Sequence, residues 1–318
     1  RQRKNSFQFT MKVYIGLLVV LISYTYCYSN SFRPNVINIY HTTQGASRQN
    51  WGVDCDTNGF MYFANNNGLL EFDGNNWKLY PLPNRITVRS VKVDREKGII
   101  YTGAYHEFGY WKRTAEGELV YTSLSKKIAN NVFQNDEIWR IVFHNGSIYF
   151  QSFSSIFIYR NDSIKVLPLQ SNSVFLLKAN NRLFIQLENF GLQELINDSL
   201  HMIPGGCMLS NGLVRTILPY EHNKFLIGSG TEGFFIFNGR EIKRWDSPVQ
   251  EKIKKAQINN GWFDGKYYYV GTIINGIYIF DTRGTLTWNF SADNYLQNNT
   301  VLGIAEDNEG NVWLGLDR

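Results

Sequence analysis

Several polar and aromatic residues stand at the starts of short apolar runs, where side chains from neighbouring strands could converge on one ligand. Arginine offers several fixed hydrogen-bond donors to hydroxyl or carboxylate groups, and tryptophan offers a flat face for stacking. Convergent polar groups in an aromatic setting suit a polar, neutral ligand such as a glycan. The candidate ligand-binding residues are Asn50, Trp51, Arg89, Glu137, Trp139, Arg140, Arg215, Asn259, Trp262 and Asn299.

Each of these residues also has an ordinary explanation. The 8 tryptophans of the chain recur at corresponding positions of successive units, which favours packing between strands over sugar stacking. Trp139 and Trp262 are the best exceptions, because each lies at the start of the innermost strand of a unit. Adjacent residues on a strand face opposite sides of its sheet, so Trp139 and Arg140 can share a cleft only if one of them lies in the preceding loop.

The sequence contains no recognisable catalytic or metal-binding pattern. Aspartates mostly sit beside glycine or asparagine in turns, where they cap backbone amides, whereas a glycosidase needs two carboxylates that face each other. The 5 histidines are scattered without the ligand spacing of a metal site. Cys55 and Cys207 have neither metal nor redox spacing. We therefore predict no catalytic residue, no metal and no cofactor.

The positive charge of the chain is concentrated at its N-terminus. The first 28 residues contain four basic side chains and no acidic one, and subtracting these four charges from the formal net charge of +5 leaves about +1 for the remainder. A nucleic-acid-binding domain needs a basic face. The sequence therefore predicts no nucleic-acid binding by this region.

The N-terminal segment resembles an export signal. Met11 and Lys12 precede a short, largely apolar run over residues 13–23, which is typical of a secretory signal peptide and short for a membrane span. We predict that residues 1–29 are upstream residues followed by a signal peptide, with cleavage between Tyr26 and Ser31 and a periplasmic mature protein. The alternative is an N-terminal membrane anchor.

The candidate residues must be positioned by a repeating β structure. Residues 51–80 contain four short aromatic and branched runs separated by Asn-Gly and Asp-Gly turns, a pattern that predicts a meander of four antiparallel strands. Similar units recur about every 40 residues, which is typical of a β-propeller. The predicted blades start near Trp51, Val88, Ile138, Val174, Val214, Ile258 and Val301.

These units predict an all-β, seven-bladed β-propeller over residues 35–318. The last blade is expected to be incomplete in this fragment, because the sequence ends before its third and fourth strands. Propellers leave few exposed sheet edges, so we expect residues 35–41 to pair as the outermost strand of the last blade and close the ring. Short helical turns are expected over residues 125–132 and 249–255.

The last unit, VLGIAEDNEGNVWLGLDR over residues 301–318, resembles the two-component regulator propeller repeat, which pairs an acidic turn with a Trp-Leu/Ile-Gly strand. The N-terminal part matches more specifically through QNWG at 49–52, YFAN at 62–65 and GLLEFDG at 68–74. Together these segments look like the N-terminal propeller of the periplasmic sensor region of Bacteroidetes hybrid two-component and triple-tyrosine-domain regulators.

This resemblance implies further parts and partners. Such regulators typically carry two propellers, a triple-tyrosine domain, an inner-membrane helix and a cytoplasmic output that regulates transcription. The implied partners are an extracellular glycan or other small polar ligand, the second propeller and triple-tyrosine domain of the same full-length chain, and a second copy in a homodimer. A histidine kinase would then lie downstream of this region.

Three functions remain open. The leading hypothesis is an extracytoplasmic ligand-sensing domain that detects a glycan or glycan fragment and does no chemistry itself. The second is a non-catalytic scaffold for protein interaction or dimerisation. The third is a polysaccharide lyase or glycosidase, because enzymes of these classes also use propellers.

Overall fold

The computed structural model describes residues 34–40, 45–129, 132–133 and 136–317. It divides into two compact units, Arg1–Ile37 and Asn38–Arg318, of which only the second contains described secondary structure. The predicted upstream residues and signal peptide over 1–29 lie outside the described residues. Within the part that the structure describes, no helix is long and apolar enough to cross a membrane.

The second unit is built from six four-stranded antiparallel sheets and one two-stranded sheet, which we number as blades 1 to 7 in chain order. Blade 1 contains β1 (Asn50–Cys55), β2 (Met61–Asn65), β3 (Gly68–Phe72) and β4 (Trp77–Tyr80). Blade 2 contains β5 (Val88–Asp94), β6 (Ile99–Ala104), β7 (Glu107–Arg113) and β8 (Leu119–Ser123). Blade 3 contains β9 (Arg140–His144), β10 (Ser147–Gln151), β11 (Ser155–Arg160) and β12 (Ser163–Pro168).

Blade 4 contains β13 (Ser173–Ala179), β14 (Arg182–Leu187), β15 (Gly191–Ile196) and β16 (Ser199–Met202). Blade 5 contains β17 (Val214–Tyr220), β18 (Lys224–Ser229), β19 (Gly233–Phe237) and β20 (Ile242–Arg244), and blade 6 contains β21 (Ile258–Phe263), β22 (Tyr267–Thr272), β23 (Ile277–Asp281) and β24 (Leu286–Phe290). Blade 7 contains β25 (Val301–Glu306) and β26 (Val312–Leu316).

Short helices connect some of the blades. They are η1 (Ser125–Lys127), η3 (Gly206–Leu209) and α2 (Gln250–Ala256). The first lies within residues 125–132, where a short helical turn was expected, and the last overlaps the expected segment 249–255 and ends one residue beyond it.

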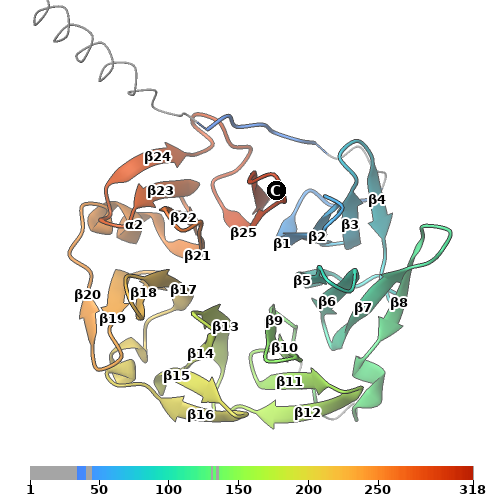
Figure 1. Cartoon of the computed structure of the whole chain (residues 1–318), viewed down its shortest axis with the longest axis horizontal. Helices are drawn as coiled ribbons and strands as arrows, with labels where there is room; N and C mark the ends of the chain where they lie inside the picture. The colour runs from blue at the N-terminus through green and yellow to red at the C-terminus, as the bar shows by residue number, and fades with distance from the viewer. Residues whose placement is uncertain (1–33, 41–44, 130–131, 134–135, 318) are drawn as a thin grey trace, which may run out of the picture. The chain divides into compact units, whose positions relative to one another are not determined.

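The first strand of every blade lies at the centre of this unit, and the later strands lie progressively further out (Figure 1). Each inner strand contacts the inner strand of the next blade, and β25 contacts β1, so the two ends of the unit meet. Since the inner strands surround the centre, residues at their starts can come close to residues of the neighbouring blades. This arrangement brings some of the candidate residues near one another.

The turns that join the strands are fixed by the acidic residues that the sequence places in them. The Asp73 carboxylate accepts the backbone N–H groups of Asn75 and Asn76, and the Asp264 carboxylate accepts those of Lys266 and Tyr267. Side-chain acceptors of this kind hold the chain in a tight turn. The prediction that these aspartates cap backbone amides is therefore confirmed.

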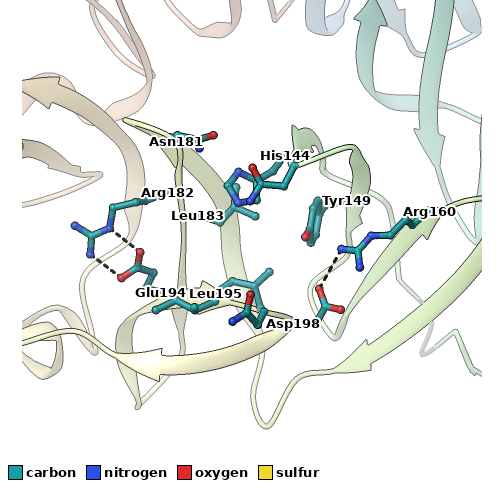
Figure 2. Close-up of a pocket in the computed structure, with 12 residues that line it drawn as sticks. His144, Tyr149, Arg160, Asn181, Arg182, Leu183, Glu194, Leu195 and Asp198 are labelled. Carbon is teal, nitrogen blue, oxygen red and sulfur yellow. Dashed lines mark hydrogen bonds and ion pairs between the residues drawn. The ribbon is translucent and has the colours of Figure 1, made fainter.

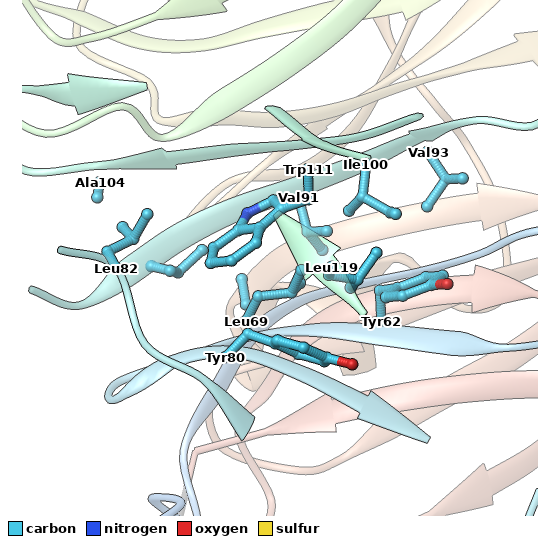
Figure 3. Close-up of a cluster of buried hydrophobic side chains, with 12 residues drawn as sticks. Tyr62, Leu69, Tyr80, Leu82, Val91, Val93, Ile100, Ala104, Trp111 and Leu119 are labelled. Atoms are coloured by element: carbon cyan, nitrogen blue, oxygen red, sulfur yellow. The ribbon is translucent and has the colours of Figure 1, made fainter. Parts of the chain in front are cut away.

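Adjacent blades are held together by apolar side chains between their sheets. Between blades 1 and 2, Tyr62 and Leu69 pack against Val91, Ile100 and Trp111 (Figure 3). Burying a side chain of this size stabilises a fold by about 1.5–3 kcal/mol. Trp111 is 3% exposed, so this tryptophan serves packing, as its repeated position predicted.

Blade 7 packs directly against blade 1. A Cβ atom on Gly303 of β25 would lie 3.0 Å from the Cα atom of Gly52 in β1. Because neither glycine has a side chain, the two inner strands can approach this closely. The described residues thus place the last and the first blade next to each other without an additional strand between them.

Two parts of the fold prediction are not confirmed. The structure shows a propeller of six complete blades, and the seventh unit has only β25 and β26 among the described residues. Residues 34–40 form no strand, although Asn38 donates a hydrogen bond to the backbone oxygen of Tyr295. Alternating apolar residues favour a strand locally, but a strand also needs a partner edge, and none pairs with residues 34–40. His41, the last residue of the predicted closing strand, lies outside the described residues.

Candidate functional site

Four of the predicted site residues gather at the starts of the inner strands of blades 1 to 3. The guanidinium carbon of Arg89 lies 4.1 Å from the ring centre of Trp51 and 5.1 Å from that of Trp139. The two indole rings contact each other edge to face, with centres 5.7 Å apart. Arginine between aromatic rings is held by cation–π attraction, so these side chains form one packed cluster.

The charge of Arg89 is neutralised inside this cluster. Its Nε atom donates a hydrogen bond of 2.9 Å to Oε1 of Glu137, and the two side chains are 19% and 23% exposed. Phe153 stacks on Trp139 with ring centres 5.3 Å apart, so much of that indole is already covered. Arg89 and Glu137 therefore neutralise each other's charge. The buried Trp139 Nε1 has no hydrogen-bond partner among the described residues.

A second group lies at the inner strands of blades 3, 4 and 5. The guanidinium carbons of Arg140 and Arg215 lie 4.0 Å and 5.2 Å from the ring centre of Phe175. Phe175 is 8% exposed, and both arginines are half-buried. We call Arg140, Phe175 and Arg215 the arginine pair site.

Neither arginine of this site has an acidic partner. Every aspartate and glutamate of the sequence lies in the described part of the chain, and none forms an ion pair with Arg140 or Arg215. Burial and the nearby charge of Arg215 lower the pKa of Arg140 to about 10, and burial also lowers the pKa of Arg215. Both guanidinium groups are charged at neutral pH, so the site carries uncompensated positive charge.

Trp139 and Arg140 point to different neighbours, as expected for adjacent residues. Trp139 precedes β9 and contacts Arg89 of blade 2. Arg140 is the first residue of β9 and contacts Phe175 of blade 4. The two residues therefore belong to different clusters.

The remaining candidates are placed elsewhere. Oδ1 of Asn50 accepts a hydrogen bond from Asn65, Asn259 donates to the backbone oxygen of Val301, and Oδ1 of Asn299 accepts the Ala292 N–H. These bonds hold neighbouring segments of backbone in place. Trp262 was expected at the start of an inner strand, but it is the fifth of the six residues of β21. It packs against Tyr269, with ring centres 5.1 Å apart.

The structure also contains a pocket that the sequence did not reveal. A cavity of about 620 Å³ lies between blades 3 and 4, away from the starts of the inner strands (Figure 2). His144, Tyr149 and Arg160 come from blade 3, and Arg182, Glu194 and Asp198 from blade 4. No motif indicates it, because its walls come from strands and turns of two separate blades. We call it the outer pocket.

The charges of the outer pocket are paired within the protein. Arg182 donates two hydrogen bonds of 2.6 Å to the two oxygens of Glu194. Asp198 accepts a hydrogen bond of 3.1 Å from Lys165 and lies 3.9 Å from Arg160. The two acids are thus held by basic partners rather than facing each other. Burial and the charge of Lys178 lower the pKa of His144, so its imidazole is neutral at pH 7.

Within the described residues there is no group of histidine, cysteine or acidic side chains that could hold a metal ion. Phe175 was not predicted as a site residue. Its signal in the sequence is weak, because one phenylalanine among 22 is indistinguishable from a core residue until the two arginines are found near its ring.

Comparison with known proteins finds one family model that matches part of the chain. Residues 295–318 match the family model described as the two component regulator propeller, which confirms the resemblance of the last unit. No curated protein matches the chain at a significant level.

Solved structures share the fold. The extracellular domain of BT4673 from B. thetaiotaomicron, described as a hybrid two component system, superposes over 89% of this chain with a TM-score of 0.67 and 19% identity. This chain covers 39% of the length of that structure. The WD40 β-propeller domain of Doa1 superposes over 86% of this chain and 91% of its own length, with a TM-score of 0.66 and 12% identity. At these identities the likeness shows the β-propeller fold.

Proposed function

We propose that this propeller is an extracytoplasmic ligand-sensing domain of a signal-transduction regulator, and that its cue is a glycan or glycan fragment. The regulator repeat at residues 295–318 and the shared fold with an extracellular domain of a hybrid two component system support the sensing role. The single observation that carries the binding role is the arginine pair site, where two half-buried arginines converge on one aromatic ring.

The same proposal covers the parts around the propeller. The domain is exported by the signal peptide over residues 1–29 and works in the periplasm. A seven-bladed ring, a second propeller, a triple-tyrosine domain and an inner-membrane anchor belong to the full-length regulator, whose output controls transcription. The fact that this chain spans 39% of the similar B. thetaiotaomicron domain supports a larger ectodomain of which this propeller is one part.

The absence of catalysis is part of the proposal. Turn aspartates such as Asp73 and Asp264 are occupied by backbone amides, and Glu194 and Asp198 are held by basic side chains. A glycosidase needs an acid and a base or nucleophile free to act on one bond. These four acids instead have structural partners.

Calorimetric titration of the ectodomain with a panel of oligosaccharides tests the proposal. We expect saturable binding of at least one member and no release of product over many turnovers. Failure of the whole panel combined with self-association of the ectodomain would favour the interaction scaffold. Repeated turnover of a polysaccharide would favour the enzyme.

A further inference from the structure

Arg140 and Arg215 differ from every other described arginine. The other ten are either ion-paired or exposed at the surface, and only these two are half-buried without an acidic partner. The ion-paired arginines are Arg89, Arg95, Arg113, Arg160, Arg182, Arg244 and Arg283. The exposed arginines without an acidic partner are Arg48, Arg85 and Arg240.

We propose that the arginine pair site is a subsite for a negatively charged group, a carboxylate or a sulfate, on the ligand of this propeller. The inference rests on the proposed function in so far as it places this anionic group on a saccharide. The anion subsite itself follows from the two arginines and would exist whatever carries the charge.

Arg140 and Arg215 carry buried charges that no acidic side chain compensates. Removing a charged group from water is unfavourable unless a partner of opposite charge or strong hydrogen bonds compensate it. Arg89 is compensated by Glu137 at 2.9 Å, whereas the charged group that acts on Arg140 is another arginine, Arg215. A bound anion would supply the compensation that the protein does not provide.

The geometry of the two guanidinium groups also suits an anion. A guanidinium group is planar and presents its donors as a fork that matches the two oxygens of a carboxylate or sulfate. Cation–π contact with Phe175 at 4.0 Å and 5.2 Å holds both side chains, and their N–H groups have no hydrogen-bond acceptor among the described residues. The donors are therefore oriented before a ligand arrives, which lowers the entropic cost of binding.

A neutral saccharide should bind to this site more weakly than an acidic one. A neutral hydroxyl group can accept hydrogen bonds from arginine but cannot balance two positive charges. Discrimination should therefore favour acidic over neutral saccharides of the same size, because only the acidic ligand relieves the repulsion between Arg140 and Arg215. This refines the neutral ligand that the sequence suggested.

The test is calorimetric titration of the protein with three probes: a trimer of galacturonic acid, a neutral galactose trimer, and inorganic sulfate. We expect the acidic trimer to bind at least roughly tenfold more tightly than the neutral one, and sulfate to bind weakly. Arg140→Met and Arg215→Met should each lower the affinity for the acidic trimer by roughly 30-fold. Arg283→Met removes an exposed arginine whose side chain is 85% exposed and should leave all affinities unchanged.

Each outcome decides a different part of the proposal. Arginine-dependent binding of sulfate without binding of either trimer would support the anion subsite and overturn its assignment to a saccharide. Equal binding of both trimers, unaffected by the arginine variants, would overturn the anion subsite and leave the sensing function standing. Binding of none of the three probes would overturn the subsite. Arg140→Lys, which keeps the charge but loses the fork, should give an intermediate affinity and serves as a second variant if Arg140→Met fails to fold.

Discussion

The outer pocket and the arginine pair site both contain an arginine packed on aromatic rings. The arginine is paired with an acidic side chain only in the outer pocket. In the outer pocket, Arg182 lies 5.0 Å from the ring centres of Phe184 and Phe225 and is bound by both oxygens of Glu194. At the inner strands, Arg140 lies over Phe175 and has no acidic partner. The charge of Arg182 is therefore balanced without a ligand, whereas the charge of Arg140 is not.

This difference teaches that a cavity and a binding site need not coincide. The outer pocket is a hollow of about 620 Å³, but its ion pairs would have to be broken before its charged groups could bind a ligand. The arginine pair site offers donors that already lack acceptors. We therefore take uncompensated charge, rather than cavity volume, as the indication of the proposed ligand site.

The largest expected effect comes from breaking the pairing of the outer pocket. Glu194→Gln leaves Arg182 over two aromatic rings without its carboxylate, and a lost charge-assisted pair of this kind costs about 2 kcal/mol. Urea unfolding should show this decrease in the free energy of unfolding. Glu188→Gln, at an exposed position without an ion pair, is the matched control and should change little. An unchanged stability of Glu194→Gln would mean that the pair is not structural.

A smaller effect of opposite sign is expected at the arginine pair site. Arg140→Met replaces an unpaired, desolvated charge with an apolar side chain that can still pack on Phe175. Because the cost of the buried charge is removed, we expect the ligand-free protein to gain about 1 kcal/mol in its free energy of unfolding. A loss of stability in the same urea experiment would show that Arg140 is already compensated and would remove the contrast between the two regions.

The aromatic ring of the arginine pair site should matter less than its charges. Phe175→Leu keeps an apolar core residue but removes the cation–π contacts to Arg140 and Arg215, which are worth about 0.5–1 kcal/mol each at partly exposed sites. We expect the affinity for an acidic ligand to fall by roughly fivefold, measured by calorimetry. A loss as large as that of Arg140→Met would mean that the ring, rather than the charge, provides the binding.

The smallest effect concerns pH. The pKa of His144 in the outer pocket is lowered in the folded protein, so the folded state disfavours the protonated imidazole. Stability from this residue is present above the ordinary histidine pKa of about 6.5 and is lost as the pH falls below it. Urea unfolding at pH 7 and pH 5 should show a small decrease that is absent in His144→Gln. An identical pH dependence in both proteins would exclude this contribution.

Much of the fold could be predicted from the sequence because its signals are local. Asn-Gly and Asp-Gly turns separate strands of three to seven residues, and the inner strands begin within two residues of the predicted blade starts. The closing strand could not be predicted in this way, because pairing of residues 35–41 depends on a distant edge. Local alternation says nothing about that edge.

The site could be predicted only as a set of positions. Residues at the starts of inner strands must converge, which is why Trp51, Arg89 and Trp139 were named and are found in contact. The sequence could not show that Glu137 neutralises Arg89 while no acid reaches Arg140, because ion pairs between blades depend on side-chain directions across blade interfaces. The outer pocket could not be predicted for the same reason, because side chains from two blades line it.

The central claim is that ligand binds at the inner-strand arginines and not at the acidic turns. The most direct measurement compares the calorimetric affinity for the tightest-binding saccharide in two sets of folded variants. One set is Arg140→Met and Arg215→Met, and the other is Asp73→Ala, Asp264→Ala and Asp281→Ala, whose carboxylates accept hydrogen bonds from the backbone of their own turns. The account predicts a loss of roughly 30-fold in the first set and unchanged affinity in the second. Full affinity in the first set would contradict it.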